Sequence, residues 1–124
     1  MYRKIENQKD IDYFLEEVNG LHDGYLIGVS YVHNGHGTGN PHWIDPEKTE
    51  LRLCYQITSI CDVVAELEFR GIRAWCVRDN GYDVLDCRVE LRDGDVIWSE
   101  DGENGSFVRA REMVWRLALP PALE

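Results

Sequence analysis

The first apolar pattern in the chain has the period of a helix. In the stretch KDIDYFLEEVNG, the apolar residues have the spacing i, i+3, i+4, i+7, which places side chains on one helical face. These residues are Ile11, Phe14, Leu15 and Val18. Asn7 or Asp10 can cap the first turn, and Gly20 can adopt the left-handed conformation that ends a helix. The pattern predicts a helix over residues 8–19 with one buried stripe.

After Gly20 the apolar residues recur at every second position, which is the period of a strand with one buried face. Four stretches show it: GYLIGVSYV, ELRLCYQITS, DVVAELEFRGI and YDVLDCRVELR. The positions predicted to share apolar faces are Tyr25, Ile27, Val29 and Tyr31; Leu51, Leu53, Tyr55 and Ile57; Ala65, Leu67 and Phe69; and Leu85, Cys87, Val89 and Leu91. Turn residues at Asn80-Gly81 and Asp93-Gly94 fit hairpin connections.

The polar positions of the middle strands carry mixed charge, so an antiparallel sheet with one covered face and one wet face is expected. The residues predicted to lie side by side on the wet face are Arg52, Glu66, Glu68, Arg70, Asp86, Arg88 and Glu90. This face is interpreted either as a solvated surface or as a docking surface. If the docking occurs between copies of the chain, a dimer is expected.

The last part of the chain, residues 106–119, fits two patterns. DVIWS and SFVRA flank a glycine-containing loop, as in a hairpin. REMVWRLAL alternates as a strand and also has the spacing of a helix, with aromatic and β-branched residues favouring the strand. The fold class expected is α+β, mainly β, in a single domain over residues 1–124. An N-terminal helix would pack on an antiparallel sheet of about six strands, open or curled into a sandwich or partial barrel.

Net charge narrows the classes of partner. The chain carries 13 basic and 23 acidic side chains, for a formal net charge of −10. Residues 79–104 contain nine of the carboxylates against two arginines. Such a field repels nucleic acid and anionic lipid and attracts a basic protein, although it is also typical of a solubilising surface. The residues proposed to bind a partner, with two tryptophans as anchors if exposed, are Trp43, Asp93, Asp95, Trp98, Glu100, Asp101 and Glu103.

Three histidines, His33, His36 and His42, lie in the glycine-rich segment 33–49, which is expected to be a loop. Zinc accepts such ligands, and a small metal-dependent or hydrolytic enzyme is therefore the alternative function. However, ordering so many flexible residues around an ion is costly, at about 1–2 kcal/mol each, so an exposed connecting loop is favoured. No metal site, cofactor or catalytic residue is predicted.

His22-Asp23-Gly24 offers another histidine beside a carboxylate. Adjacent residues seldom face each other as a catalytic pair, and no nucleophile is implied. Asp23 and Gly24 are expected to shape the turn into the first strand while His22 hydrogen-bonds the backbone.

The four cysteines, Cys54, Cys61, Cys76 and Cys87, contain no C-x-x-C pair. The N-terminal stretch lacks the apolar region of an export signal, and no apolar run is long enough to span a membrane. Reduced cysteines and a cytoplasmic location are therefore expected, with two disulfides as the less favoured alternative.

The order of these motifs resembles that of a loose group of small bacterial proteins, in which a short helix precedes an HD-G or HD-A strand and a late strand carries A…W-R. The residues that carry the resemblance are His22, Asp23, Ala110, Trp115 and Arg116. Some small acidic proteins of this make-up are immunity proteins, which neutralise a co-encoded toxin by binding it. The resemblance implies a bacterial protein-binding function and no catalytic residues.

Overall fold

The computed structural model describes residues 1–33, 48–59, 63–78, 83–101 and 105–119. The strands are β1 (Arg3–Lys4), β2 (Gly24–His33), β3 (Thr49–Ile57), β4 (Val63–Cys76), β5 (Cys87–Arg92), β6 (Asp95–Glu100) and β7 (Phe107–Ala118). The helices are α1 (Gln8–Glu17) and a short 3₁₀ turn, η1 (Asn19–Leu21). The predicted loop over residues 33–49 lies largely outside the described residues, as does the predicted Asn80-Gly81 turn.

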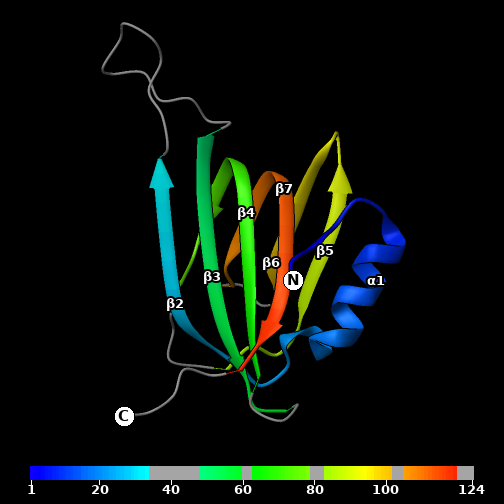
Figure 1. Ribbon diagram of the computed structural model, residues 1–124, viewed down its shortest axis with the longest axis vertical. Helices are drawn as coiled ribbons and strands as arrows, with labels where there is room; N and C mark the ends of the chain where they lie inside the picture. The colour runs from blue at the N-terminus through cyan, green and yellow to red at the C-terminus, as the bar shows by residue number, and fades with distance from the viewer. Residues whose placement is uncertain (34–47, 60–62, 79–82, 102–104, 120–124) are drawn as a thin grey trace, which may run out of the picture.

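All strands belong to one antiparallel sheet in the order β2-β3-β4-β7-β6-β5, and β1 pairs with β7. The first half of β7 pairs with β6 and its second half with β1. In Figure 1 the long strands β4 and β7 bend over the top of the molecule, so that the sheet curls back on itself. The sheet does not close into a barrel. The helix α1 and the single antiparallel sheet confirm the predicted α+β, mainly β class.

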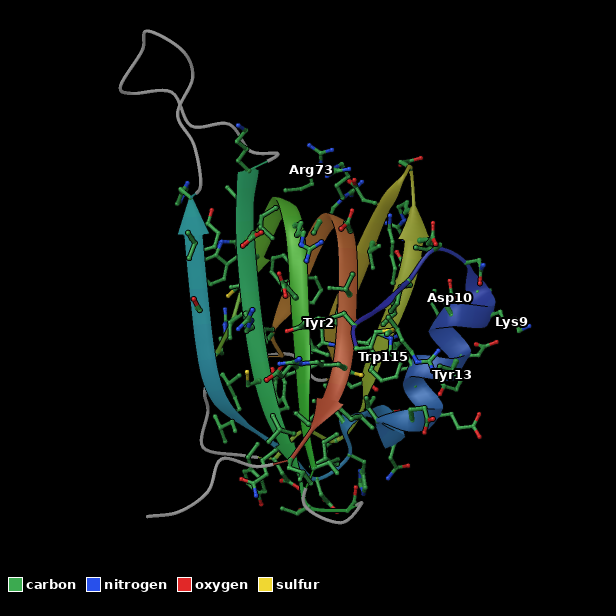
Figure 2. The ribbon with its side chains drawn as sticks, in the orientation of Figure 1. Tyr2, Lys9, Asp10, Tyr13, Arg73 and Trp115 are labelled. Atoms are coloured by element: carbon green, nitrogen blue, oxygen red, sulfur yellow. The ribbon has the colours of Figure 1, made fainter. Side chains whose placement is uncertain are left out.

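The core lies on the inner face of this curled sheet. Tyr55, Phe69 and Trp98 are fully buried there, and their rings lie about 6 Å apart, with centroid distances of 5.9 and 6.0 Å to the indole. Helix α1 fills the side between β7 and β5, where Phe14 meets Trp115 edge-on at 5.2 Å. Figure 2 shows Tyr13 of the same helix beside this indole.

The N-terminal helix confirms the sequence prediction in detail. Its first turn is capped by Asn7, whose Oδ1 accepts a hydrogen bond of 3.0 Å from the backbone N–H of Asp10. Ile11, Phe14 and Val18 are buried, as the apolar stripe requires. Gly20 follows at φ 61°, the left-handed conformation expected at the end of the helix.

Strand β2 departs from the predicted alternation. A bulge between Leu26 and Gly28 inserts one extra residue, so Leu26 pairs with Tyr55 while Gly28 pairs with Cys54. The prediction that Tyr25, Ile27, Val29 and Tyr31 share one face is therefore wrong, since the bulge separates the first two from the last two. Tyr25, Ile27 and Val29 are all exposed.

The other predicted strands agree with the structure except in β5, where Leu91, predicted to share the apolar face, is exposed. Strand β5 begins at Cys87, and Leu85, which was predicted to face the core, is 67% exposed. The C-terminal segment is a strand, and Met113 and Trp115 are buried as predicted for that alternative. The Asp93-Gly94 hairpin is confirmed: both residues have positive φ, at 52° and 81°, as a type I′ turn requires.

Charges on the outer face of β3, β4 and β7 are arranged in pairs. Arg116 bonds Glu66, Arg52 lies 3.5 Å from Glu68, and Arg70 bonds Glu112 at 3.0 Å. The prediction of side-by-side charges is thus correct for Arg52, Glu66, Glu68 and Arg70. It is wrong for Asp86, Arg88 and Glu90, because they lie on or beside β5, at the far end of the strand order.

Three of the cysteines lie in described segments, and none of them forms a disulfide. Cys87 is buried, Cys54 and Cys76 are half-buried, and Cys61 lies outside the described residues. Within the described part of the chain, no helix is both long enough and apolar enough to cross a membrane.

Candidate functional site: the groove between α1 and β5

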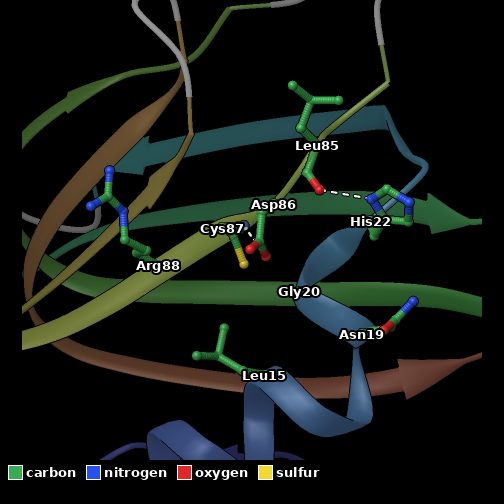
Figure 3. Close-up of a pocket in the computed structure, with 8 residues that line it drawn as sticks. All are labelled: Leu15, Asn19, Gly20, His22, Leu85, Asp86, Cys87 and Arg88. Carbon is green, nitrogen blue, oxygen red and sulfur yellow. Dashed lines mark hydrogen bonds between the residues drawn. The ribbon is translucent and has the colours of Figure 1, made fainter.

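Two adjoining cavities, of about 490 and about 300 Å³, lie between α1–η1 and the edge strand β5. Both are lined by Leu15 of the helix and Arg88 of the strand, so they lie next to each other along the same side of β5. Figure 3 shows the larger cavity, with the helical segment on one side and Asp86, Cys87 and Arg88 on the other. We refer to this feature as the α1–β5 groove.

A left-handed turn forms one end of the groove. Asn19, Gly20 and Leu21 have φ of 51°, 61° and 58°, a conformation that costs about 1–2 kcal/mol for each non-glycine residue. The turn is held because Leu21 is fully buried and its N–H donates to the carbonyl of Val18 at 2.9 Å. Backbone strain of this kind is found at binding and catalytic sites when the surrounding packing fixes it.

Gly20 allows the carboxylate of Asp86 to lie against this turn. A Cβ atom at position 20 would be 2.1 Å from Asp86 Oδ1, which is too close for any larger residue without movement of the aspartate. The same oxygen accepts a hydrogen bond of 2.9 Å from the backbone N–H of Cys87. The Asp86 side chain is therefore oriented by two separate parts of the chain.

His22 lies beside the groove on the surface. Its Nδ1 lies 2.8 Å from the carbonyl oxygen of Leu85, and its Nε2 is 3.6 Å from Asp23 Oδ2. The hydrogen bond to Leu85 and then the charge of Asp23 raise the pKa of His22 above its ordinary value. The structure confirms that His22 bonds the backbone and that Asp23, at φ 59°, lies in the turn before β2.

The groove has no activated nucleophile among its described side chains. Cys87 lines it, but the residue is only 2% exposed, and burial raises the pKa of its thiol to about 12. A thiol is a poor nucleophile until it ionises, so Cys87 acts as a packed core residue. The arrangement suits binding better than covalent chemistry.

Charge sets this groove apart from the rest of the molecule. Residues 6–23, which include α1, carry six acidic side chains and one lysine, and residues 83–101, which include β5, carry seven acidic side chains and two arginines. Acidic and basic side chains are equal in number over the remaining residues. The excess of carboxylates thus comes from the two segments that contribute residues to the groove, and within its lining the charged residues are Asp86, Glu90 and Arg88.

Asp12 and Glu16 extend this acidic character along the helix. They follow Gln8, which lines the smaller cavity, at four-residue intervals, on the exposed part of the helix next to the side that lines the groove. Gln8 Nε2 donates to Asp12 Oδ1 at 2.9 Å, which fixes the first of them. Within the described residues, neither Asp12 nor Glu16 forms a salt bridge.

The sequence analysis did not identify these helical carboxylates. It assigned the acidic surface to residues 79–104 alone, because the proximity of α1 to β5 is a tertiary feature. The local signal was nevertheless present, since a single lysine stands among the six acidic residues of 6–23.

The predicted partner-binding residues are dispersed. Trp98 was proposed as an anchor only if it is exposed, and it is fully buried. Asp95 is also buried, and it accepts a hydrogen bond of 2.8 Å from Arg109 and lies 3.5 Å from Arg73. Neither residue offers a surface to a partner, because Trp98 packs in the core and Asp95 is occupied by the two arginines.

The other predicted residues divide into three groups. Glu100 is half-buried and accepts hydrogen bonds from the hydroxyl of Tyr55 and the backbone N–H of Ser106. Asp101 pairs with Arg88 at 2.9 Å, and Asp93 is exposed in the β5–β6 turn. Trp43 and Glu103 lie outside the described residues.

The predicted histidine loop can be followed only at its start. His33 ends β2, is exposed, and meets the ring of Tyr31 edge-on at 4.7 Å. His36 and His42 lie outside the described residues. Over the segments that the structure describes, no three His, Cys, Asp or Glu side chains form a group that could hold a metal ion.

Comparison with known proteins adds no assignment: the chain matches no family model, no curated protein and no solved structure. Interpretation of the α1–β5 groove therefore rests on its own geometry and charge.

Proposed function

We propose that this chain is a protein-binding protein that recruits a basic partner through the α1–β5 groove. The observation that carries the proposal is that the groove is built from the two segments richest in carboxylates, residues 6–23 and 83–101, and has Asp86 and Glu90 in its lining. On the outer face of the sheet, by contrast, carboxylates are paired with arginines of neighbouring strands. Beside the groove, Arg88 and Arg92 offset only Asp101 and Glu90, so a cationic protein meets an excess of carboxylates there and paired charges on the sheet.

The groove also combines charge with apolar contact surface. Leu15 is half-buried and lines both cavities, while Leu85 at the end of the larger cavity is largely exposed. Electrostatic attraction increases the rate of encounter, and contacts of this apolar kind slow dissociation once the partner is bound. Long basic side chains can make both the electrostatic and the apolar contacts, since their methylene stems pack on apolar groups while their charged ends reach carboxylates.

A more specific form of the proposal is that the partner is a toxin that this chain neutralises. That form depends on the resemblance to a group of small bacterial proteins carried by His22, Asp23, Ala110, Trp115 and Arg116, because some small acidic proteins of similar make-up are immunity proteins. It needs no catalytic residue, in keeping with a groove that contains a buried, protonated thiol and a surface histidine.

The proposal is tested by capturing partners from a lysate of the native host at about 50 mM and about 500 mM NaCl. A groove variant and a control variant each lose three carboxylates and have the same net charge. The groove variant is Asp12→Asn, Glu16→Gln and Asp86→Asn, and the control is Glu47→Gln, Glu50→Gln and Asp62→Asn, three carboxylates outside residues 6–23 and 83–101.

We expect a basic protein to bind the wild type and the control at low salt and to be released at high salt. With each surface pair contributing about 0.2–1 kcal/mol, the groove variant should bind about 3- to 150-fold more weakly. Capture of no basic protein, capture indifferent to salt, or equal losses in the two variants would contradict the proposal.

A further inference from the structure

A second surface, separate from the groove, lies along the free edge of β2. This strand is at one end of the sheet, and its ten residues, Gly24–His33, include no Asp, Glu, Lys or Arg. Tyr25, Ile27, Val29 and Val32 are 43–48% exposed. On the side of β2 that faces away from β3, backbone pairing among the described residues is limited to the bridge between Gly24 and Val84.

The opposite edge of the sheet is built differently. Strand β5 has α1 packed against it and carries Arg88, Glu90 and Arg92. Covering an edge with a helix and placing charges on it are the usual ways in which proteins prevent unwanted pairing of strands. Strand β2 has a bulge at Leu26–Gly28 but no charge and no helix, which leaves Val29 to His33 as a regular, uncharged edge.

We propose that this edge pairs antiparallel with β2 of a second copy of the chain, joining the two sheets. Antiparallel pairing of identical strands places the same residues on both sides of a two-fold axis, so one surface satisfies both partners. Each strand then supplies hydrogen-bonding groups to the other, as when an extended peptide is added to a sheet edge.

Charge favours a second copy over a basic partner at this place. Two chains that each carry −10 repel one another unless their carboxylates stay apart, and β2 lies on the opposite side of the molecule from α1 in Figure 1. Interactions between exposed charges fall off over about 8 Å at physiological salt, so contact through β2 keeps the two acidic grooves beyond effective repulsion. A cationic protein finds no carboxylate within β2 to bind.

The test is sedimentation equilibrium from about 5 µM to about 500 µM protein. The average mass is expected to rise with concentration from that of the 14.4 kDa chain toward twice that value. Val29→Lys should abolish the rise, because it places one lysine from each chain within the paired edge, where the two like charges repel each other. Leu91→Lys, which makes the same charge change at a 42% exposed apolar residue on the opposite edge, should leave it intact.

A wild type that stays monomeric at every concentration overturns the proposal. Loss of the dimer in both lysine variants also overturns it, because the contact would then not be specific to β2. Circular dichroism confirms that Val29→Lys is folded. Hydrogen exchange of the wild type gives a second measurement, in which protection of the amides of residues 24–33 should increase with concentration; protection that increases elsewhere and not in β2 contradicts the pairing.

Discussion

The substitution Gly20→Ala tests the geometry of the α1–β5 groove most sharply. Gly20 has a positive φ, and the space that a Cβ would occupy is taken by the Asp86 carboxylate at 2.1 Å. The change therefore has two costs: alanine in the left-handed conformation, and displacement of Asp86. The first costs about 1–2 kcal/mol. The second removes the hydrogen bond that the backbone N–H of Cys87 donates to Asp86 Oδ1, worth about 1 kcal/mol.

The two costs can be separated with a matched glycine. Gly94 has φ 81° and no atom within 4 Å of the position of a Cβ, so Gly94→Ala carries the backbone cost alone. Urea unfolding should show a loss of about 2–3 kcal/mol for Gly20→Ala and about 1–2 kcal/mol for Gly94→Ala. With a slope of about 2 kcal/mol per molar urea, the midpoint of Gly20→Ala falls by about 1 M.

A double-mutant cycle then identifies the contact. In an Asp86→Ala background the carboxylate is gone, so Gly20→Ala should cost no more than Gly94→Ala does in the wild type. If the two glycine substitutions cost the same in the wild type, or if the excess at position 20 persists without Asp86, the described packing of the carboxylate on the turn is wrong.

Three further predictions concern ionisable groups. The Arg109 and Arg73 side chains lower the pKa of Asp95, so Asp95→Asn should lower the free energy of unfolding at pH 7. The difference in unfolding free energy from wild type should shrink as pH falls below about 4. A difference that stays unchanged in acid contradicts the pairing. Tyr55→Phe leaves Glu100 without its phenolic donor and should cost about 1–3 kcal/mol in thermal or urea unfolding, whereas a neutral effect would show that the bond adds nothing. Protonation of His22, whose pKa is raised, adds positive charge beside the groove, so affinity for an oligolysine peptide should fall from pH 8 to pH 6, and His22→Gln should flatten that profile.

Much of the fold could be predicted because its elements have regular local periods. The alternation in β3 and β4 predicts burial of Leu53 and Leu67, which lie opposite each other in the register, and the stripe of α1 is equally regular. The β5–β6 turn was predictable because Asp-Gly is a preferred sequence for a hairpin turn with positive φ at both central positions. Asp93 and Gly94 adopt that conformation. In these cases one stretch of sequence contains the whole signal.

The bulge in β2 was not predictable, because the alternation continues through it with apolar residues on both sides. Leu26 and Ile27 are both suitable for a core, and only the pairing with β3 decides that Leu26 lies opposite Tyr55. Gly28 was the one local sign, since glycine within a strand often marks a bulge. Contacts with other strands, which the sequence does not show, therefore determined the register.

The candidate site was predicted in part. The acidic character of residues 79–104 supplies one wall of the groove, through Asp86 and Glu90. The other wall was missed, because residues 6–23 lie beside β5 only in the folded chain. Trp98, proposed as an anchor if exposed, is buried in the core against Tyr55 and Phe69, and Asp95 is buried beside Arg109 and Arg73, contacts that the local sequence does not show.

The central claim, that the molecule's negative charge forms a binding site between α1 and β5, is tested most directly by titrating the ¹⁵N-labelled chain with an oligolysine peptide and following amide shifts by NMR. Our account predicts that the largest shifts occur in residues 8–22 and 85–90, and that they disappear as salt is added. Shifts concentrated on the outer face of β3 and β4, or no shifts at low salt, would contradict it.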